Sequence, residues 1–99
     1  MRTLPALLLL LLPSAAPAAE TPFYVGTWDC EVSTFTFTET TYDPGEAPLA
    51  IRSVTRDGEN AYTLAFDDGY AIGVSRIDGQ SMQWLSHASG DMFTCKRLP

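Results

Sequence analysis

Four side chains near the C-terminus are of the types that a hydrolase uses. The segment Ser86-His87-Ala88-Ser89-Gly90-Asp91 holds the single histidine of the chain beside two serines and an aspartate. A Ser/His/Asp triad would carry out nucleophilic acyl transfer, but a triad is defined by three-dimensional geometry, and these residues are neighbours in one short turn. The sequence also has no Gly-x-Ser-x-Gly nucleophile elbow. We therefore expect no catalytic residues and a protein that is not an enzyme.

The residue types that bind metal ions are few and poorly spaced. A structural zinc site needs four Cys- or His-type ligands, whereas the sequence has one histidine and two cysteines. Asp67-Asp68 and the separated Glu39, Asp43 and Glu46 lack the spacing of an EF-hand calcium loop, and turn formation explains an aspartate such as Asp68. We expect no metal and no other cofactor.

Residues 1–18 read as a cleaved signal peptide. Arg2 provides the positive start, an apolar run of leucines follows, and Ala16-Pro17-Ala18 matches the small-x-small pattern that the peptidase cleaves. The run is much shorter than the roughly 20 residues of a membrane span, so we expect no anchor in the mature form. No cysteine stands at the cleavage site to take a lipid. Residues 19–99 would form a single periplasmic or secreted domain.

Two cysteines, Cys30 and Cys95, enclose most of the expected mature chain. In an oxidising compartment we expect them to form a disulfide. A loop of this length gives a stabilisation of about 4 kcal/mol in the chain-entropy model. A core this small supplies only ~3–5 kcal/mol by itself, so the bridge would carry much of the stability.

Glycine turns at regular spacing divide the C-terminal half into strands. The four turn dipeptides are Asp57-Gly58, Asp68-Gly69, Asp78-Gly79 and Ser89-Gly90. Between them, large residues such as Tyr62, Leu64 and Phe66 alternate with small ones, the period of a half-buried strand. Trp84 and Met82 continue the large side. This half therefore predicts an antiparallel meander.

The N-terminal half is less regular. The first expected strand has its apolar residues at even positions: Trp28, Cys30 and Val32. After it the apolar residues fall at odd positions, Phe35 and Phe37. A turn or bulge near Ser33 explains the slip. We expect a turn over residues 42–45, a loop over 46–49 and a further strand over 51–55. The chain as a whole predicts an all-β domain of six to seven short strands, closed into a small barrel or a rolled sheet, with the first and last strands tied by the disulfide.

Gly26-Thr27-Trp28 resembles the Gly-x-Trp signature of calycin-type barrels, which include lipocalin-like families and small bacterial metalloprotease inhibitors. The resemblance implies that Trp28 plugs the bottom of a barrel and that Gly26 lets the chain turn inward. A core tryptophan of an unrelated β-domain is the alternative reading for Trp28.

Ser89-Gly90-x-x-Phe93 resembles the Ser-Gly-x-x-Tyr loop of bacterial inhibitors of C-type lysozyme, which are also small, exported, disulfide-tied barrels. The resemblance implies that Ser89 reaches into the cleft of a hydrolase. A hairpin that needs glycine at this point is the alternative.

The charge composition limits the classes of partner that the protein is expected to bind. Without Arg2, five cations face twelve acids, and the net charge becomes −7. Nucleic acid and anionic membranes are then poor partners, and a cationic protein is a better one. The small residues Ala61, Thr63, Ala65, Ala71 and Gly73 fall on one unusually flat, uncharged side of the meander, where a partner could approach closely.

We therefore expect a non-enzymatic binding module, specifically an inhibitor of a secreted or envelope hydrolase. Its candidate contact residues are Ser86, His87, Ser89, Gly90 and Asp91. The alternative is a calycin-like carrier in which Trp28, Trp84, Tyr62 and Tyr70 line a ligand cavity.

Overall fold

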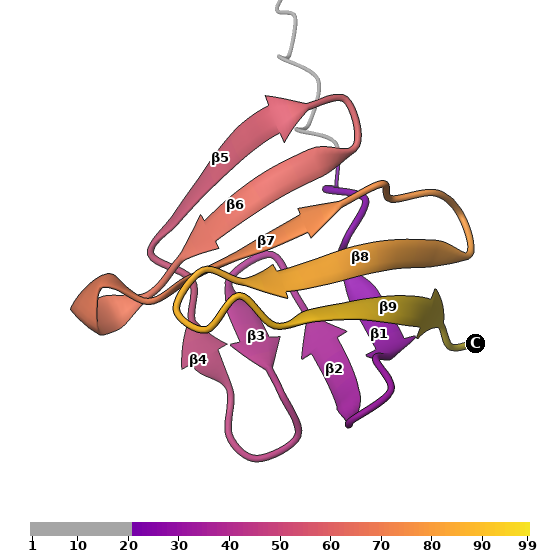
Figure 1. Ribbon diagram of the computed structural model, residues 1–99, viewed down its shortest axis with the longest axis horizontal. Helices are drawn as coiled ribbons and strands as arrows, with labels where there is room; N and C mark the ends of the chain where they lie inside the picture. Colours follow the sequence, from indigo (N-terminus) through magenta and orange to yellow (C-terminus); the bar gives the residue numbers. More distant parts are fainter. Residues whose placement is uncertain (1–20) are drawn as a thin grey trace, which may run out of the picture.

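One antiparallel sheet curls around an aromatic core in the computed structural model, which describes residues 21–99 (Figure 1). The predicted signal peptide lies outside the described residues. The described elements are β1 (Gly26–Asp29), β2 (Thr34–Phe37), β3 (Thr41–Asp43), β4 (Leu49–Ala50), β5 (Ser53–Gly58), β6 (Ala61–Ala65), the short 3-10 helix η1 (Asp67–Gly69), β7 (Ala71–Ser75), β8 (Ser81–Ser86) and β9 (Met92–Arg97).

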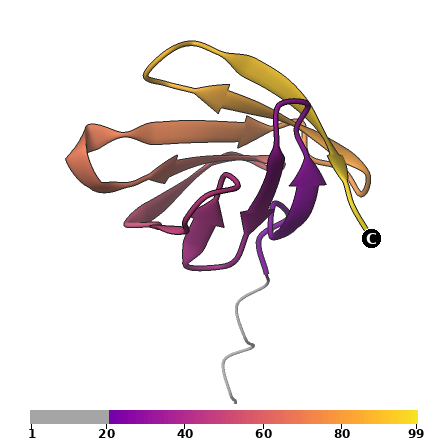
Figure 2. The ribbon, with the colours of Figure 1, turned by 90° about the horizontal axis from the view of Figure 1, so that it is seen from below.

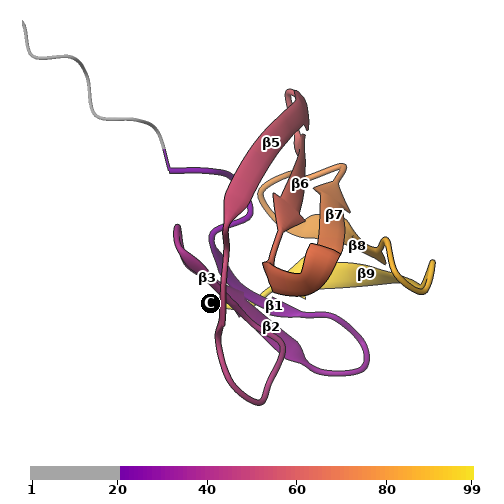
Figure 3. The ribbon, with the colours of Figure 1, turned by 90° about the vertical axis from the view of Figure 1, so that its left-hand side faces the viewer.

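The order of strands across the sheet is β4-β3-β2-β1-β9-β8-β7-β6-β5. Neighbouring strands are consecutive in the chain except at one seam, where the first strand, β1, pairs with the last strand, β9. The two edge strands, β4 and β5, are consecutive in the chain, and only residues 51–52 separate them. The sheet therefore has to curl until its edges approach, as Figures 2 and 3 show. Of the two predicted forms, the structure has the rolled sheet.

Alternating large and small residues decide which side of the sheet faces inward. In β6, Tyr62 and Leu64 are buried while Ala61, Thr63 and Ala65 are half-buried on the outer side. The same alternation holds in β7 and β8, as the period of a strand requires. At the β5 edge the roll is incomplete, and Val54, opposite Leu64, keeps 42% of its surface exposed.

Aromatic rings fill the interior. Tyr24 packs edge-on against Tyr62, and Phe35 packs edge-on against Tyr42, with ring centroids 5.0 and 5.5 Å apart. Such pairs add about 0.5–1.5 kcal/mol beyond the area that they bury. Burial raises the pKa of the Tyr42 hydroxyl well above its ordinary value, and burial followed by the nearby Tyr62 raises that of Tyr24. Burial therefore favours the neutral form of both phenols.

Each of the four predicted turn dipeptides falls at or next to a connection between consecutive strands, from β5 to β9. Gly69 and Gly90 adopt positive φ values of 75° and 81°, which glycine reaches without steric cost. Asp68 also has a positive φ, 62°. The predicted slip near Ser33 is a turn between β1 and β2, in which Glu31 adopts a φ of 73°.

The prediction of six to seven strands was too low, because two short strands were read as turn and loop. Tyr42 and Asp43 belong to β3, and Tyr42 is buried in the core. Leu49 and Ala50 form β4, which pairs with β3 through Thr41↔Ala50 and Tyr42↔Leu49. The reversal itself covers only residues 44–48. Strands of two and three residues are too short to display an alternating pattern.

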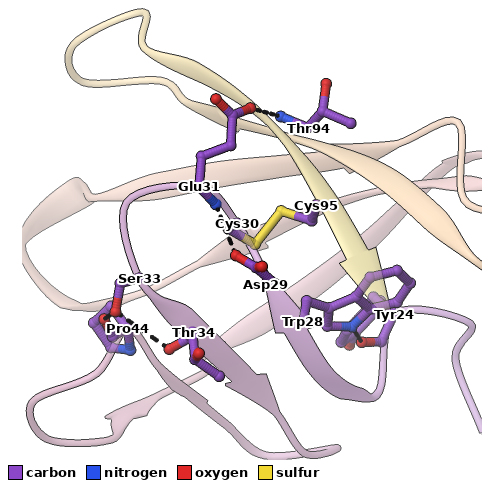
Figure 4. The surroundings of a disulfide bond; sticks show 10 residues. All are labelled: Tyr24, Trp28, Asp29, Cys30, Glu31, Ser33, Thr34, Pro44, Thr94 and Cys95. Carbon is purple, nitrogen blue, oxygen red and sulfur yellow. Dashed lines mark hydrogen bonds between the residues drawn. A yellow bond between two sulfur atoms is a disulfide. The ribbon is translucent and has the colours of Figure 1, made fainter. Parts of the chain in front are cut away.

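The predicted disulfide joins Cys30 and Cys95 at the β1–β9 seam (Figure 4). The ladder pairs Trp28 with Arg97 and Asp29 with Lys96, and the same register puts the two cysteines directly opposite each other. Their Cα atoms are 4.0 Å apart. One residue further, the Glu31 carboxylate accepts a hydrogen bond from the Thr94 backbone N–H at 2.8 Å. A side chain thus continues the ladder where the backbone of Glu31 turns away.

Candidate functional site

The predicted contact turn connects β8 to β9. The Ser86 N–H donates to the Asp91 carbonyl and the Gly90 N–H donates to the Ser86 carbonyl, at 2.9 and 2.8 Å. The Ser86 hydroxyl accepts the Ser89 N–H, and the Ser89 hydroxyl accepts the Asp91 N–H. Ser86 is only 5% exposed, so it stabilises the turn from inside. His87, Ser89, Gly90 and Asp91 are exposed.

His87 leaves this turn and lies on the outer side of β7. Its backbone N–H donates to the Ala71 carbonyl at 3.1 Å. Its Nε2 atom is 3.4 Å from the point that a Cβ on Gly73 would occupy. A Cβ at position 73 would therefore be in van der Waals contact with the imidazole, which lies directly over Gly73. Among the described residues, the imidazole makes no hydrogen bond to Ser86, Ser89 or Asp91, so the geometry assembles no triad.

The predicted small residues do share the outer side, and we call them the flat face. Thr63 stands opposite Gly73, and Ala65 stands opposite Ala71. The Thr63 hydroxyl donates to the Asp57 carboxylate at 2.6 Å, which places an acid at the β5 border of the face. The flat face consists of Ala61, Thr63, Ala65, Ala71 and Gly73.

Two apolar residues that sequence reasoning missed extend the flat face. Leu85 stands opposite Gly73, and Met92 of β9 stands opposite Leu85. Met92 keeps 55% of its surface exposed, which is unusual for so apolar a side chain. The alternation in β8 could have identified Leu85, but Met92 is placed only by the pairing register of β8 with β9.

Arg97, which the sequence analysis did not single out, packs against Gly26 and Trp28. The Trp28 ring is fully buried, its indole N–H donates to the Tyr24 carbonyl at 2.9 Å, and the Arg97 guanidinium lies 4.2 Å above it. A Cβ on Gly26 would be 2.6 Å from Nη1 of Arg97, so the glycine makes space for the guanidinium. The sequence could have indicated this contact only through spacing, because Arg97 lies two residues after Cys95 and its side chain therefore points to the same, inner side of the sheet.

Trp84, the third predicted core residue, is buried and stacks on Phe93 with ring centroids 5.3 Å apart. The Trp84 side chain limits the rise in the pKa of the Tyr42 phenol, while the Trp84 indole N–H has no hydrogen-bond partner among residues 21–99. The Tyr24 hydroxyl likewise has no partner among residues 21–99.

Two hollows open on the ends of the roll. One of about 570 Å³ is bordered by Phe23, Val25, Ile77 and Arg97, and the other, of about 350 Å³, lies between β4 and η1. Beside the second hollow, Arg52 and Asp67 form an exposed ion pair at 2.8 Å, and the hydrogen bond from Arg52 lowers the pKa of Asp67.

Within residues 21–99, no three His, Cys, Asp or Glu side chains gather closely enough to hold a metal ion. The same residues contain no helix with the length and apolar character needed to cross a membrane. The chain matches no known family model, no curated protein and no solved structure.

Proposed function

We propose that this chain is a small exported binding module that engages a protein partner through the flat face and the 86–91 turn together. The observation that carries the proposal is the position of His87 over Gly73, because it joins the turn to the face as one continuous surface. Met92 and Leu85 extend that surface with apolar area. Exposed apolar area next to polar turn residues is typical of protein-binding sites.

The composition of the flat face favours a protein over a small ligand. β6 and β7 contain no charged residue, and their outer side chains are too small to form walls around a ligand. Flat surfaces of this kind suit another flat surface, whereas small-molecule sites are concave. The alternative carrier hypothesis placed four rings around a ligand cavity: Trp28, Trp84, Tyr62 and Tyr70. The first three are buried in the packed interior, and Tyr70 borders the smaller hollow between β4 and η1.

Inhibition of a secreted or envelope hydrolase is the specific role that we propose. The Ser89 hydroxyl oxygen accepts the Asp91 N–H, which leaves its own proton free for an acceptor on a partner. The acidic mature chain suits a cationic enzyme, as electrostatic steering favours opposite charges. The Cys30–Cys95 disulfide fits an oxidising compartment, which the periplasm and the extracellular space both provide.

The test is affinity capture with the oxidised chain, residues 19–99, as bait in native envelope extract and culture fluid. Two variants alter the proposed binding surface. H87A/S89A/D91A removes the polar side chains of the turn, and A71R puts a large charge on the flat face. E46A, in the exposed loop between β3 and β4, is the matched control.

We expect one stoichiometric partner that binds the wild-type chain and E46A and is lost from both surface variants. A partner retained by both variants would contradict the proposed surface. For the hydrolase role, the captured enzyme is assayed with increasing amounts of the chain. Undiminished activity at saturation would exclude inhibition and leave a binding module of another kind.

A further inference from the structure

The larger hollow has the size and lining of a small-molecule site. It measures about 570 Å³, within the usual range of ligand pockets. Phe23, Val25 and Ile77 give it apolar walls, and Arg97 contributes the one cation among its described lining residues. It lies at the end of β8 where residue 79 precedes the strand, whereas the 86–91 turn follows the other end. The hollow is therefore separate from the proposed protein-binding surface.

Backbone carbonyls hold Arg97 in place, and no counter-ion stands among residues 21–99. Its Nε donates to the Gly79 carbonyl, Nη1 to the Val25 carbonyl and Nη2 to the Phe23 carbonyl, at 3.2, 3.1 and 2.8 Å. A guanidinium has five N–H donors, so two remain without a partner among residues 21–99. The side chain is half-buried over Trp28, and no carboxylate of the described residues forms an ion pair with it.

One acid, Asp78, also borders the hollow, but its carboxylate is committed elsewhere. Its Oδ1 atom accepts the N–H groups of Gln80 and Ser81 at 2.7 and 2.8 Å. These bonds lower the pKa of Asp78, so it stays ionised and bound to its own turn. Within the described part of the chain, the charge of Arg97 is thus balanced by carbonyl dipoles and the indole ring.

We propose that this hollow binds a small amphiphilic monocarboxylate, such as a medium-chain fatty acid or an aromatic acid of similar size. The carboxylate accepts the two free N–H donors of Arg97, a charge-assisted interaction that a planar guanidinium is shaped to make. The apolar part of the ligand lies against Phe23, Val25 and Ile77. Binding at this site requires no catalysis and leaves the flat face exposed.

The test compares octanoate with octan-1-ol by ¹⁵N NMR titration of the oxidised chain, residues 19–99. The two probes share one chain length and differ in the head group. We expect octanoate to shift the amides of Val25, Ile77 and Gly79 and to bind about tenfold more tightly than the alcohol. Equal affinities, or no shift at these amides with millimolar octanoate, would overturn the proposal.

Three variants separate the head-group contact from the apolar wall. R97K keeps the positive charge but loses the planar guanidinium. The affinity for octanoate should therefore fall severalfold, while the affinity for octan-1-ol should not change. K96M removes the neighbouring exposed cation and should leave octanoate binding as it was. If K96M weakened octanoate binding as much as R97K does, the binding would result from general electrostatic attraction, and the proposed contact with Arg97 would be wrong.

F23S tests the apolar wall without touching the arginine. The Phe23 side chain is 45% exposed and its carbonyl is retained, so the fold should tolerate the change. We expect both probes to weaken by a similar factor. Unchanged affinity for both would show that the apolar part of the ligand does not lie in this hollow.

Discussion

The β1–β9 seam and the β4–β5 corner both complete the roll, yet they are held in different ways. At the seam the backbone ladder has only two residue pairs, and the Cys30–Cys95 bridge and Glu31 add side-chain ties (Figure 4). Arg97 adds a further tie through its hydrogen bond to the Val25 carbonyl. At the corner the chain itself continues from one edge to the other, and the side-chain tie is the exposed Arg52–Asp67 pair.

The difference follows from loop closure. Strands that are far apart in the chain lose more entropy when they meet than strands joined by two residues. At the corner, two backbone hydrogen bonds suffice: Ile51 donates to Thr40 of one half and Arg52 donates to Ala65 of the other. The seam has no such continuity and is held by a disulfide, by side-chain hydrogen bonds and by the cation–π contact of Arg97 with Trp28. Variants at the two places should therefore differ widely in cost.

The largest effect should come from removing the disulfide. The double variant C30A/C95A should lose about 4 kcal/mol of unfolding free energy, because the bridge closes nearly the whole domain. Urea unfolding followed by tryptophan fluorescence measures it. Reduction of the wild-type chain is the matched control and should cost a similar amount. A loss below about 1 kcal/mol would mean that the other ties already hold the seam.

R97M should have the next largest effect, about 2 kcal/mol, because three carbonyls lose a charged donor and Trp28 loses its cation. K96M, one residue away and exposed, should stay within about 0.5 kcal/mol. G26A crowds the same guanidinium, so part of its cost should disappear in the R97M background. Additive costs would show that Gly26 is required only for its own backbone conformation, with φ at 144°.

At Glu31 two substitutions separate the hydrogen bond from the backbone. E31A should cost about 1 kcal/mol, since it loses the bond to the Thr94 N–H. E31G loses the same bond, but glycine accepts the φ of 73° without strain, so its net cost should be smaller. The urea midpoints of the two variants, compared at equal m-values, show which substitution costs more stability. A costlier E31G would show that the left-handed conformation is not a burden here.

The smallest effect should come from the corner. D67N removes the Arg52–Asp67 pair, and because both side chains are exposed we expect no resolvable change in stability at physiological salt. The pair lowers the pKa of Asp67, so its small contribution is present above the unfolded-state pKa and is lost as the pH falls through the lowered value. NMR titration of Asp67 in R52M should show the pKa rising towards its ordinary value.

Sequence reasoning succeeded where one residue type dictates one local structure. The alternation around Tyr62 and Leu64, the turns at Gly69 and Gly90, and the cysteine pairing all followed from local chemistry. It missed β3 because Tyr42-Asp43 precedes Pro44-Gly45, so a buried strand residue sat inside a strong turn signal.

Apart from the disulfide, long-range contacts were beyond that reasoning. The partners of Arg97 are backbone carbonyls at positions 23, 25 and 79, and carbonyls carry no sequence signature. Met92 joined the flat face only through its register with Leu85. The candidate turn was located from its residue types, but the sequence could not indicate that His87 lies over Gly73, because that contact depends on the pairing of β7 with β8.

The β1–β9 seam also brings the two ends of the described chain together, because Arg97 contacts Phe23 and Leu98 donates to Thr27. A circular permutant is therefore feasible, in which a short linker joins residue 99 to residue 21 and new termini open in the exposed loop at 46–47. In that chain the two cysteines would enclose only a short loop that passes through the linker. The chain-entropy relation then gives the bridge roughly 1 kcal/mol less stabilisation in an unchanged fold. The same sulfur bond would thus be worth less once the order of the strands in the chain is changed.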